Sequence, residues 1–189
     1  MPSVVLAALV ALAVCGAPLA ATVVVPTEFK EIVSDASLIV TGHITDVRSV
    51  VVPNGGLESI GTIGVEAVLK GQADAFVSIH VPGGEIGRDR FVMVGAPRLT
   101  VGEGAVFFLK RGADNGWRPV GLTMGIFRMQ SEPQTGRAIV DPPLMTGQTA
   151  AAGPVVRGDN RRRSMPVQEF ESLVRLVVVS QGLAQGVRR

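Results

Sequence analysis

The chain has 189 residues and a formal net charge of +2; 47% of the residues are apolar, 18% are charged and only 4% are aromatic. This length provides one domain with a proper core but hardly two, especially once a leader is removed. The abundance of valine, glycine and proline favours strands and turns over a helical bundle, because β-branched side chains pack well on a pleated surface and glycine forms tight turns.

An apolar leader opens the chain. Residues 1–25 carry no charged side chain, and the apolar run at 4–17 passes into a stretch of small residues. This pattern predicts a signal peptide over residues 1–21, cleaved after Ala20 or Ala21, and therefore a secreted or periplasmic protein. A retained anchor is the alternative, because no Lys or Arg precedes the apolar run. No later stretch has the roughly 18 continuous apolar residues of a spanning helix, so we expect no membrane span after cleavage.

Cys15 is the only cysteine of the sequence and lies inside this leader. A lipoprotein signal is a further alternative, but it needs a small residue where Val14 stands. Cleavage after Ala20 leaves a mature chain without cysteine, which excludes disulfides, thiolate zinc sites and cysteine nucleophiles.

Residues 22–140 form the predicted barrel domain, which begins with a short helix. Thr27 caps this helix, and the spacing of Phe29, Ile32 and Val33 puts three apolar side chains on one face before residues 34–37 end it. The next stretch, 38–52, is rich in Val, Ile and Thr and predicts one long strand, bent at Gly42.

Two further strands follow a turn at residues 53–56. The strand at 60–69 should place Ile63, Val65, Ala67 and Leu69 on one face, and the strand at 76–81 alternates apolar and polar residues. Residues 82–87 form a glycine-rich loop, and residues 91–94 form a short strand.

The second half of the barrel domain centres on residues 105–110. Their continuous apolar run is typical of a strand buried on both sides. Residues 114–116 predict a hairpin turn, followed by strands at 117–120, 125–130 and 138–140. The pattern predicts a mainly β fold, a small antiparallel OB-like β-barrel with a short N-terminal and a C-terminal helix.

The C-terminal part begins with a change of composition. Residues 141–163 are rich in Pro, Gly, Ala, Thr and Arg and predict a flexible linker. Residues 164–189 form a helix and tail; Pro166 starts the helix, and Gly182 stops it. The apolar stripe of this helix, made of Val167, Phe170, Val174 and Val177, packs back on the barrel, with a partner-binding helix as the alternative.

The order of four motifs resembles a group of uncharacterised exported bacterial domains. The motifs are SDASLIVTG at 34–42, VEAVLKG at 65–71, VPGG at 81–84, and VGE at 101–103 ahead of FFL at 107–109. More distantly, the succession is similar to the netrin-like domain of the tissue inhibitors of metalloproteinases, a five-stranded OB-type barrel. Those inhibitors bind the protease zinc through an N-terminal cysteine, which this chain lacks after cleavage, so the resemblance implies the fold and not that mechanism.

The sequence offers little catalytic or metal chemistry. His43 and His80 each stand alone in a strand without the spacing of zinc ligands, so we expect strand-surface histidines and neither metal nor cofactor. Ser78, His80 and an aspartate supply the residue types of a triad, but no Gly-x-Ser-x-Gly elbow occurs. We therefore predict a protein that is not an enzyme, with a hydrolase as the third hypothesis.

The first candidate for a ligand-facing edge is the glycine-rich loop with its neighbouring arginines, and its binding residues are Gly83, Gly84, Glu85, Arg88 and Arg90. The loop lacks the Lys and Ser/Thr of a phosphate-binding loop, so its glycines serve tight turns. The run Arg161–Arg163 could attract anionic polymers, but export argues against nucleic acid. The leading hypothesis is an exported binding domain for a protein or cell-envelope partner; the alternative is an accessory or inhibitory domain of a secreted protease.

Overall fold

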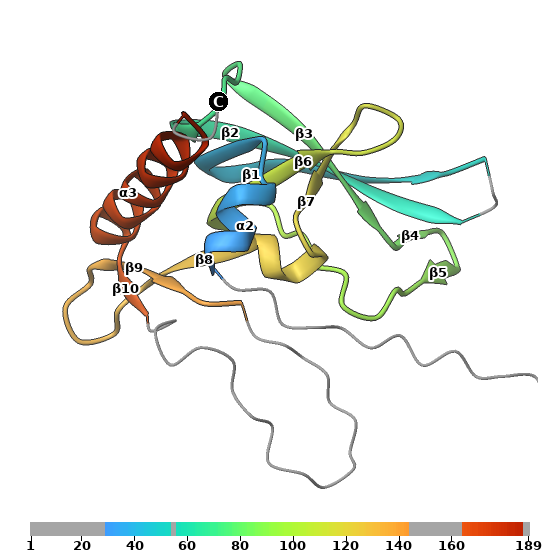
Figure 1. Cartoon of the computed structure of the whole chain (residues 1–189). Helices are drawn as coiled ribbons and strands as arrows, with labels where there is room; N and C mark the ends of the chain where they lie inside the picture. The colour runs from blue at the N-terminus through green and yellow to red at the C-terminus, as the bar shows by residue number, and fades with distance from the viewer. Residues whose placement is uncertain (1–28, 54–55, 144–163, 187–189) are drawn as a thin grey trace, which may run out of the picture.

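A computed structural model describes residues 29–53, 56–143 and 164–186 (Figure 1). The chain is mainly β, with one helix before the strands and one after them. In chain order the elements are α2 (Phe29–Asp35), β1 (Leu38–Val51), β2 (Leu57–Lys70), β3 (Phe76–Pro82), β4 (Gly84–Ile86), β5 (Asp89–Phe91), β6 (Gly104–Arg111), β7 (Trp117–Pro119), the 3-10 helix η1 (Leu122–Gly125), β8 (Ile126–Ser131), β9 (Ala138–Asp141), β10 (Met165–Pro166) and α3 (Val167–Gly186).

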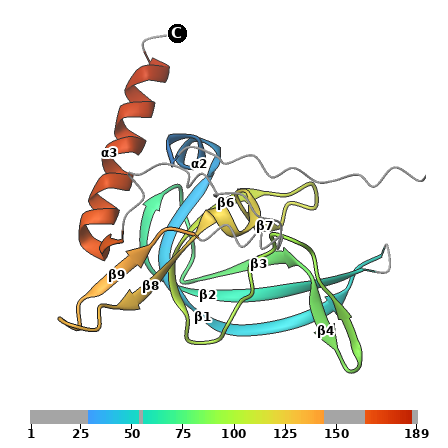
Figure 2. The same cartoon turned by 90° about the horizontal axis from the view of Figure 1, so that it is seen from below.

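Five strands close into a barrel in the order β1-β2-β3-β7-β6, and β6 returns to β1. Four of these pairings are antiparallel, but β3 and β7 run parallel where Ile79 lies opposite Trp117. The predicted OB-like barrel is therefore confirmed, with one parallel contact that the expected antiparallel sheet did not include. The long strands β1 and β2 curve around the barrel (Figure 2).

Strand β6 is buried on both faces, as its continuous apolar run predicts. Phe107 and Leu109 point into the barrel, whereas Val106 and Phe108 face the helices outside it. All four side chains are at most 1% exposed. The strand thus separates two apolar cores, an inner core within the barrel and an outer core between the barrel wall and the helices.

The expectation of one apolar face along β2 is wrong. Ile63 and Val65 belong to the inner core, but Leu69 lies in the outer core. The pairing with β1 shifts register between Thr41 and Gly42 and again between Ile39 and Val40. Each irregularity changes which residues share a face, because side chains alternate with a period of two. The predicted bend at Gly42 coincides with one of these shifts.

Helices α2 and α3 close the outer core, which confirms that α3 packs back on the barrel. Four phenylalanines meet there, with ring centroids 5.0–6.3 Å apart: Phe29, Phe108, Phe127 and Phe170. The hydroxyl of the buried Thr41 donates to a carboxylate oxygen of Glu171 at 2.6 Å and ties β1 to α3. The predicted stripe of α3 is buried at Phe170, Val174 and Val177.

Several predicted boundaries are wrong. Gly182 does not stop α3, which runs on to Gly186. Pro166 does not start α3, which begins at Val167, because Met165 and Pro166 form the short strand β10 that pairs with β9. Residues 84–86, expected in a loop, form β4, and the strand expected at 91–94 is instead β5 at Asp89–Phe91, followed by an irregular loop.

Other predictions fall on residues outside the described ranges. They concern the leader at 1–21, the cap at Thr27, residues 54 and 55 of the turn at 53–56, most of the linker at 141–163, and the run Arg161–Arg163. They stay predictions. Among the residues that are described, no helix combines the length and apolar character needed to cross a membrane.

Candidate functional site

The hairpin formed by β4 and β5 stands apart from the barrel sheet as a two-stranded unit. Gly83 joins it to β3 with a φ of +102°, a conformation that favours glycine. A Cβ on Gly84 would lie 2.7 Å from the Ser49 Oγ, so a larger residue there would displace the Ser49 hydroxyl where the hairpin approaches β1. Both glycines therefore have structural roles at the base of the hairpin, as predicted for the tight turns of this segment.

The loop after β5, residues 92–103, folds back onto one end of the barrel. Leu99 packs so closely on Gly61 that a Cβ there would lie 2.6 Å from the Leu99 Cδ1. The Gly102 amide donates to the Ile44 carbonyl oxygen at 2.8 Å, and the Ile44 amide donates to the Glu103 carbonyl oxygen at 2.9 Å. These contacts fix the loop opposite the hairpin.

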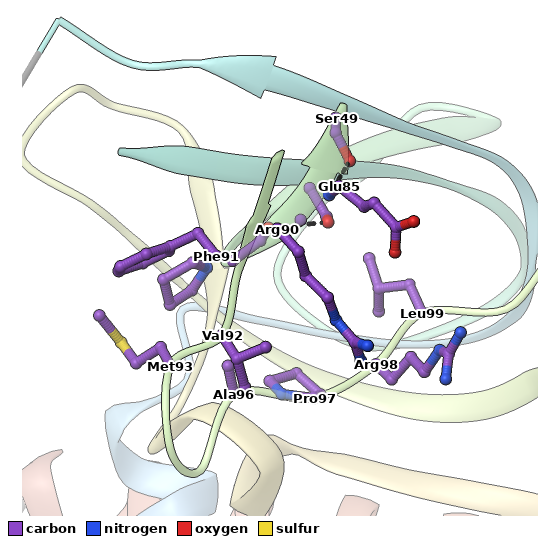
Figure 3. Close-up of a pocket in the computed structure, with 14 residues that line it drawn as sticks. Ser49, Glu85, Arg90, Phe91, Val92, Met93, Ala96, Pro97, Arg98 and Leu99 are labelled. Atoms are coloured by element: carbon purple, nitrogen blue, oxygen red, sulfur yellow. Dashed lines mark hydrogen bonds between the residues drawn. The ribbon is translucent and has the colours of Figure 1, made fainter. Parts of the chain in front are cut away.

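A hollow of about 240 Å³ lies between the hairpin, the folded-back loop and the strands β1 and β2 (Figure 3). It is lined by polar groups on the hairpin side and by apolar side chains on the loop side. The residues are Ser49, Ser59, Pro82, Gly83, Gly84, Glu85, Arg90, Phe91, Val92, Met93, Ala96, Pro97, Arg98 and Leu99.

Four of the five predicted binding residues line this hollow: Gly83, Gly84, Glu85 and Arg90. Arg88 does not line it, because it lies with Gly87 in the turn at the tip of the hairpin. Arg98 and the apolar residues from Phe91 to Met93 also line the hollow and were not among the predicted binding residues. For the apolar residues, the sequence signal was an uninterrupted apolar run directly after Arg90 in a region of turns. That a ligand binds here stays a prediction.

Exposed apolar side chains lie in the hairpin and the loop after it, and three of them, Phe91, Val92 and Met93, line the hollow. The exposed fractions are 39% for Ile86, 43% for Phe91, 67% for Val92, 40% for Met93 and 81% for Val94. We call these five residues the hairpin patch. A contiguous group of exposed apolar side chains on a small domain is typical of a surface that another molecule covers.

The arginines at the hollow differ from Arg118 and Arg128, whose guanidinium groups form ion pairs. Arg118 pairs with Glu58 and Asp114, and Arg128 pairs with Glu103. For Arg90 and Arg98, by contrast, the described residues provide no side-chain hydrogen bond or ion pair; the Arg98 carbonyl accepts a bond from Arg128. The hollow therefore combines apolar walls with two guanidinium groups that form no ion pair within the described residues, and with the carboxylate of Glu85.

A second polar cluster joins β2, β3 and β7. Glu58 lies 2.8 Å from an Arg118 nitrogen and 3.2 Å from the His80 Nδ1, and Arg118 also reaches Asp114 at 3.0 Å. In this cluster each charge has a partner. Within this cluster, His80 on β3 contacts Glu58 on β2 and so links the two strands.

The structure brings together neither a triad nor a metal site in its described part. His80 pairs with Glu58, and no hydrogen bond joins it to Ser78 among the described residues. His43 lies on the strand surface, 2.9 Å from a carboxylate oxygen of Glu66. No group of three or more His, Cys, Asp or Glu side chains within the described ranges is arranged to hold a metal ion.

Neither a protein-family model nor a curated protein matches this sequence. Fold and site define the chain as a small OB-like barrel that carries an exposed apolar hairpin patch and a basic hollow. The resemblance to exported bacterial domains and netrin-like barrels stays a prediction.

Proposed function

We propose that this protein is an exported, non-enzymatic binding domain that holds a protein or cell-envelope partner against the hairpin patch. The observation that carries the proposal is the exposure of five apolar side chains within the hairpin and the loop after it, three of which line one hollow. Leaving them in water costs free energy, about 25 cal/mol for each Å² of apolar surface, and a partner removes this cost. The closed barrel provides a rigid support for such a surface.

Export is the part of the proposal that the leader supports. We expect expression of the full-length gene in a bacterial host to yield a periplasmic or secreted chain that begins at Ala21 or Thr22. Mass spectrometry of the cell fractions measures this start. Recovery of the full-length chain from the membrane fraction would instead favour the retained anchor.

Partner binding is tested by mutating the hairpin patch. The mature protein is immobilised and exposed to periplasmic extract and to solubilised envelope of the native host, and a retained partner is identified and its affinity measured. The double variant Val92→Ser/Val94→Ser should lose at least about 90% of the binding, because polar side chains remove the apolar contact. Both residues are largely exposed, so the thermal midpoint should hardly change.

A matched control makes the same kind of change elsewhere. Val179→Ser/Leu183→Ser alters two side chains of α3 that are 61% and 68% exposed, and it should leave binding intact. Equal loss in both double variants would show that general surface hydrophobicity, and not the hairpin patch, holds the partner. If the partner is one secreted protease whose activity changes on binding, the accessory or inhibitory role replaces the general one.

A further inference from the structure

The guanidinium groups of Arg90 and Arg98 determine which chemistry the hollow can bind. Both residues line it, and Figure 3 shows the Arg90 side chain crossing the hollow toward Arg98. Glu85 lies opposite Arg90 in the hairpin register, yet no ion pair between them forms in the described structure. Both guanidinium groups thus remain available for an anion.

We propose that the hollow binds a carboxylate side chain of a partner protein between Arg90 and Arg98, while apolar side chains of the same partner cover the hairpin patch. Arginine suits this role because its planar guanidinium donates two parallel hydrogen bonds to one carboxylate. The inference rests on the proposed function, since it specifies the partner that the patch holds.

The distribution of apolar surface favours a polypeptide over a small ligand. A hollow of about 240 Å³ accommodates one side chain or a small organic anion. Val94, 81% exposed, does not line the hollow, and neither does Ile86. A small ligand would leave both in water. A protein segment covers them together with the hollow, in the usual arrangement of a central anchor with apolar contacts around it.

The same geometry disfavours an anionic membrane surface. The two arginines line a hollow, and a flat bilayer contacts residues that protrude from a protein more easily than residues that line a hollow. The inferred partner is therefore a polypeptide segment with an acidic side chain beside aliphatic or aromatic ones.

The probe for this inference is a phage library of random dodecapeptides, selected on the mature protein. We expect the selected peptides to carry Asp or Glu within two positions of an aliphatic or aromatic residue. Synthetic, fluorescein-labelled copies are then titrated by fluorescence anisotropy. Binding should weaken as salt increases, and replacing the acidic residue by its amide should lower the affinity about tenfold.

Variants of the protein give the decisive comparison. Arg90→Ser/Arg98→Ser should lower the affinity for these peptides at least about tenfold. The control Arg137→Ser/Arg175→Ser removes the same charge at exposed positions on the turn before β9 and on α3, and it should change the affinity less than about twofold. Circular dichroism confirms that each variant is folded. Selection of basic or purely apolar peptides, or equal affinity for Arg90→Ser/Arg98→Ser, would overturn the inference.

Two further results separate this inference from the proposed function. A native partner that binds Arg90→Ser/Arg98→Ser normally but not Val92→Ser/Val94→Ser would preserve the binding function and refute the carboxylate anchor. The wild-type protein could also sediment with phosphatidylglycerol vesicles while Arg90→Ser/Arg98→Ser does not, and the phage selection could yield no peptide. This combined result would assign the hollow to a lipid surface and refute the carboxylate anchor.

Discussion

Glu58 links three strands of the barrel through one carboxylate, which contacts Arg118 on β7 and His80 on β3. Burial alone would raise the pKa of this carboxyl, but the hydrogen bonds from Arg118 and His80 outweigh burial and hold the pKa below its ordinary value of 4.5. A lowered pKa in the folded state adds stability above the unfolded value, and this stability is lost as the pH falls through the folded value.

Glu58→Gln should lower the free energy of unfolding by about 1 kcal/mol at neutral pH, because the amide forms weaker hydrogen bonds with Arg118. The difference between wild type and variant should shrink as the pH falls below 4.5 and through the lowered pKa of the folded state, where the wild-type carboxyl also loses its charge. Urea denaturation across this pH range measures it. A difference that stays constant with pH would show that the charge of Glu58 is not what stabilises the cluster.

Two glycines allow a paired test of packing. A Cβ on Gly42 would lie 2.2 Å from the Gly64 carbonyl oxygen, whereas a Cβ on Gly182 of α3 meets nothing within 4 Å. Gly42→Ala should therefore destabilise the protein by about 2 kcal/mol or more, because backbone must move. Gly182→Ala should be neutral or stabilise α3 by up to about 1 kcal/mol. Thermal unfolding of both variants checks the contrast, and similar midpoints would contradict it.

Among the elements, α3 has the clearest dependence on one side chain. Phe170 is 5% exposed, and its ring centroid lies 5.0 Å from that of Phe127. Phe170→Ala should lower the free energy of unfolding by about 3–5 kcal/mol, because the outer core cannot refill the space. Leu176→Ala on the same helix, at a side chain 67% exposed, should cost less than about 1 kcal/mol. Denaturant titration measures the free energy of unfolding of both variants. Equal losses would contradict the packing of α3 on the outer core through Phe170.

How well each element could be predicted follows from how strongly its apolar pattern repeats. The alternation in β3, the continuous run in β6 and the stripe of α3 each identify their element, because burial imposes that period. The faces of β2 could not be predicted, since a bulge shifts the alternation without changing composition. Strands β4 and β5 are three residues each, too short to show a period.

The candidate site was predictable in part for the same reason. Glycines and charges beside a turn identify a loop, and so Gly83 to Glu85 and Arg90 were found. Arg98 joins them only because the chain folds back through Leu99 onto Gly61, a long-range contact. The apolar residues from Phe91 to Met93 suggested a strand, because composition does not distinguish a buried strand from an exposed apolar loop.

At the scale of the whole molecule, the two cores share their walls. Strand β1 contributes Val40 to the inner core and Ile39 to the outer core, and β6 contributes Phe107 and Phe108 in the same way. If one core comes apart, one face of β1 and β6 becomes exposed to water. The other core depends on the same two strands, so it is destabilised as well. We therefore expect the described fold to unfold as one cooperative unit.

Trp117 reports on the barrel and α3 reports on the outer core. Trp117, the only tryptophan of the chain, packs against the inner core. Its fluorescence and the helical circular dichroism signal should give the same urea midpoint, because neither core persists alone. Midpoints that differ by more than about 0.5 M would show that α3 detaches before the barrel opens.

The barrel closes through β1, β2, β3, β7 and β6 without strand pairing to β4 or β5. Evolution or a designer can thus splice a different hairpin between Gly83 and Ala96 and alter what is recognised while the scaffold keeps its strand order. If the hairpin patch holds a partner as proposed, a library randomised only in that insert would vary most of the recognition surface on one unchanged frame, with Arg98 as the fixed contact.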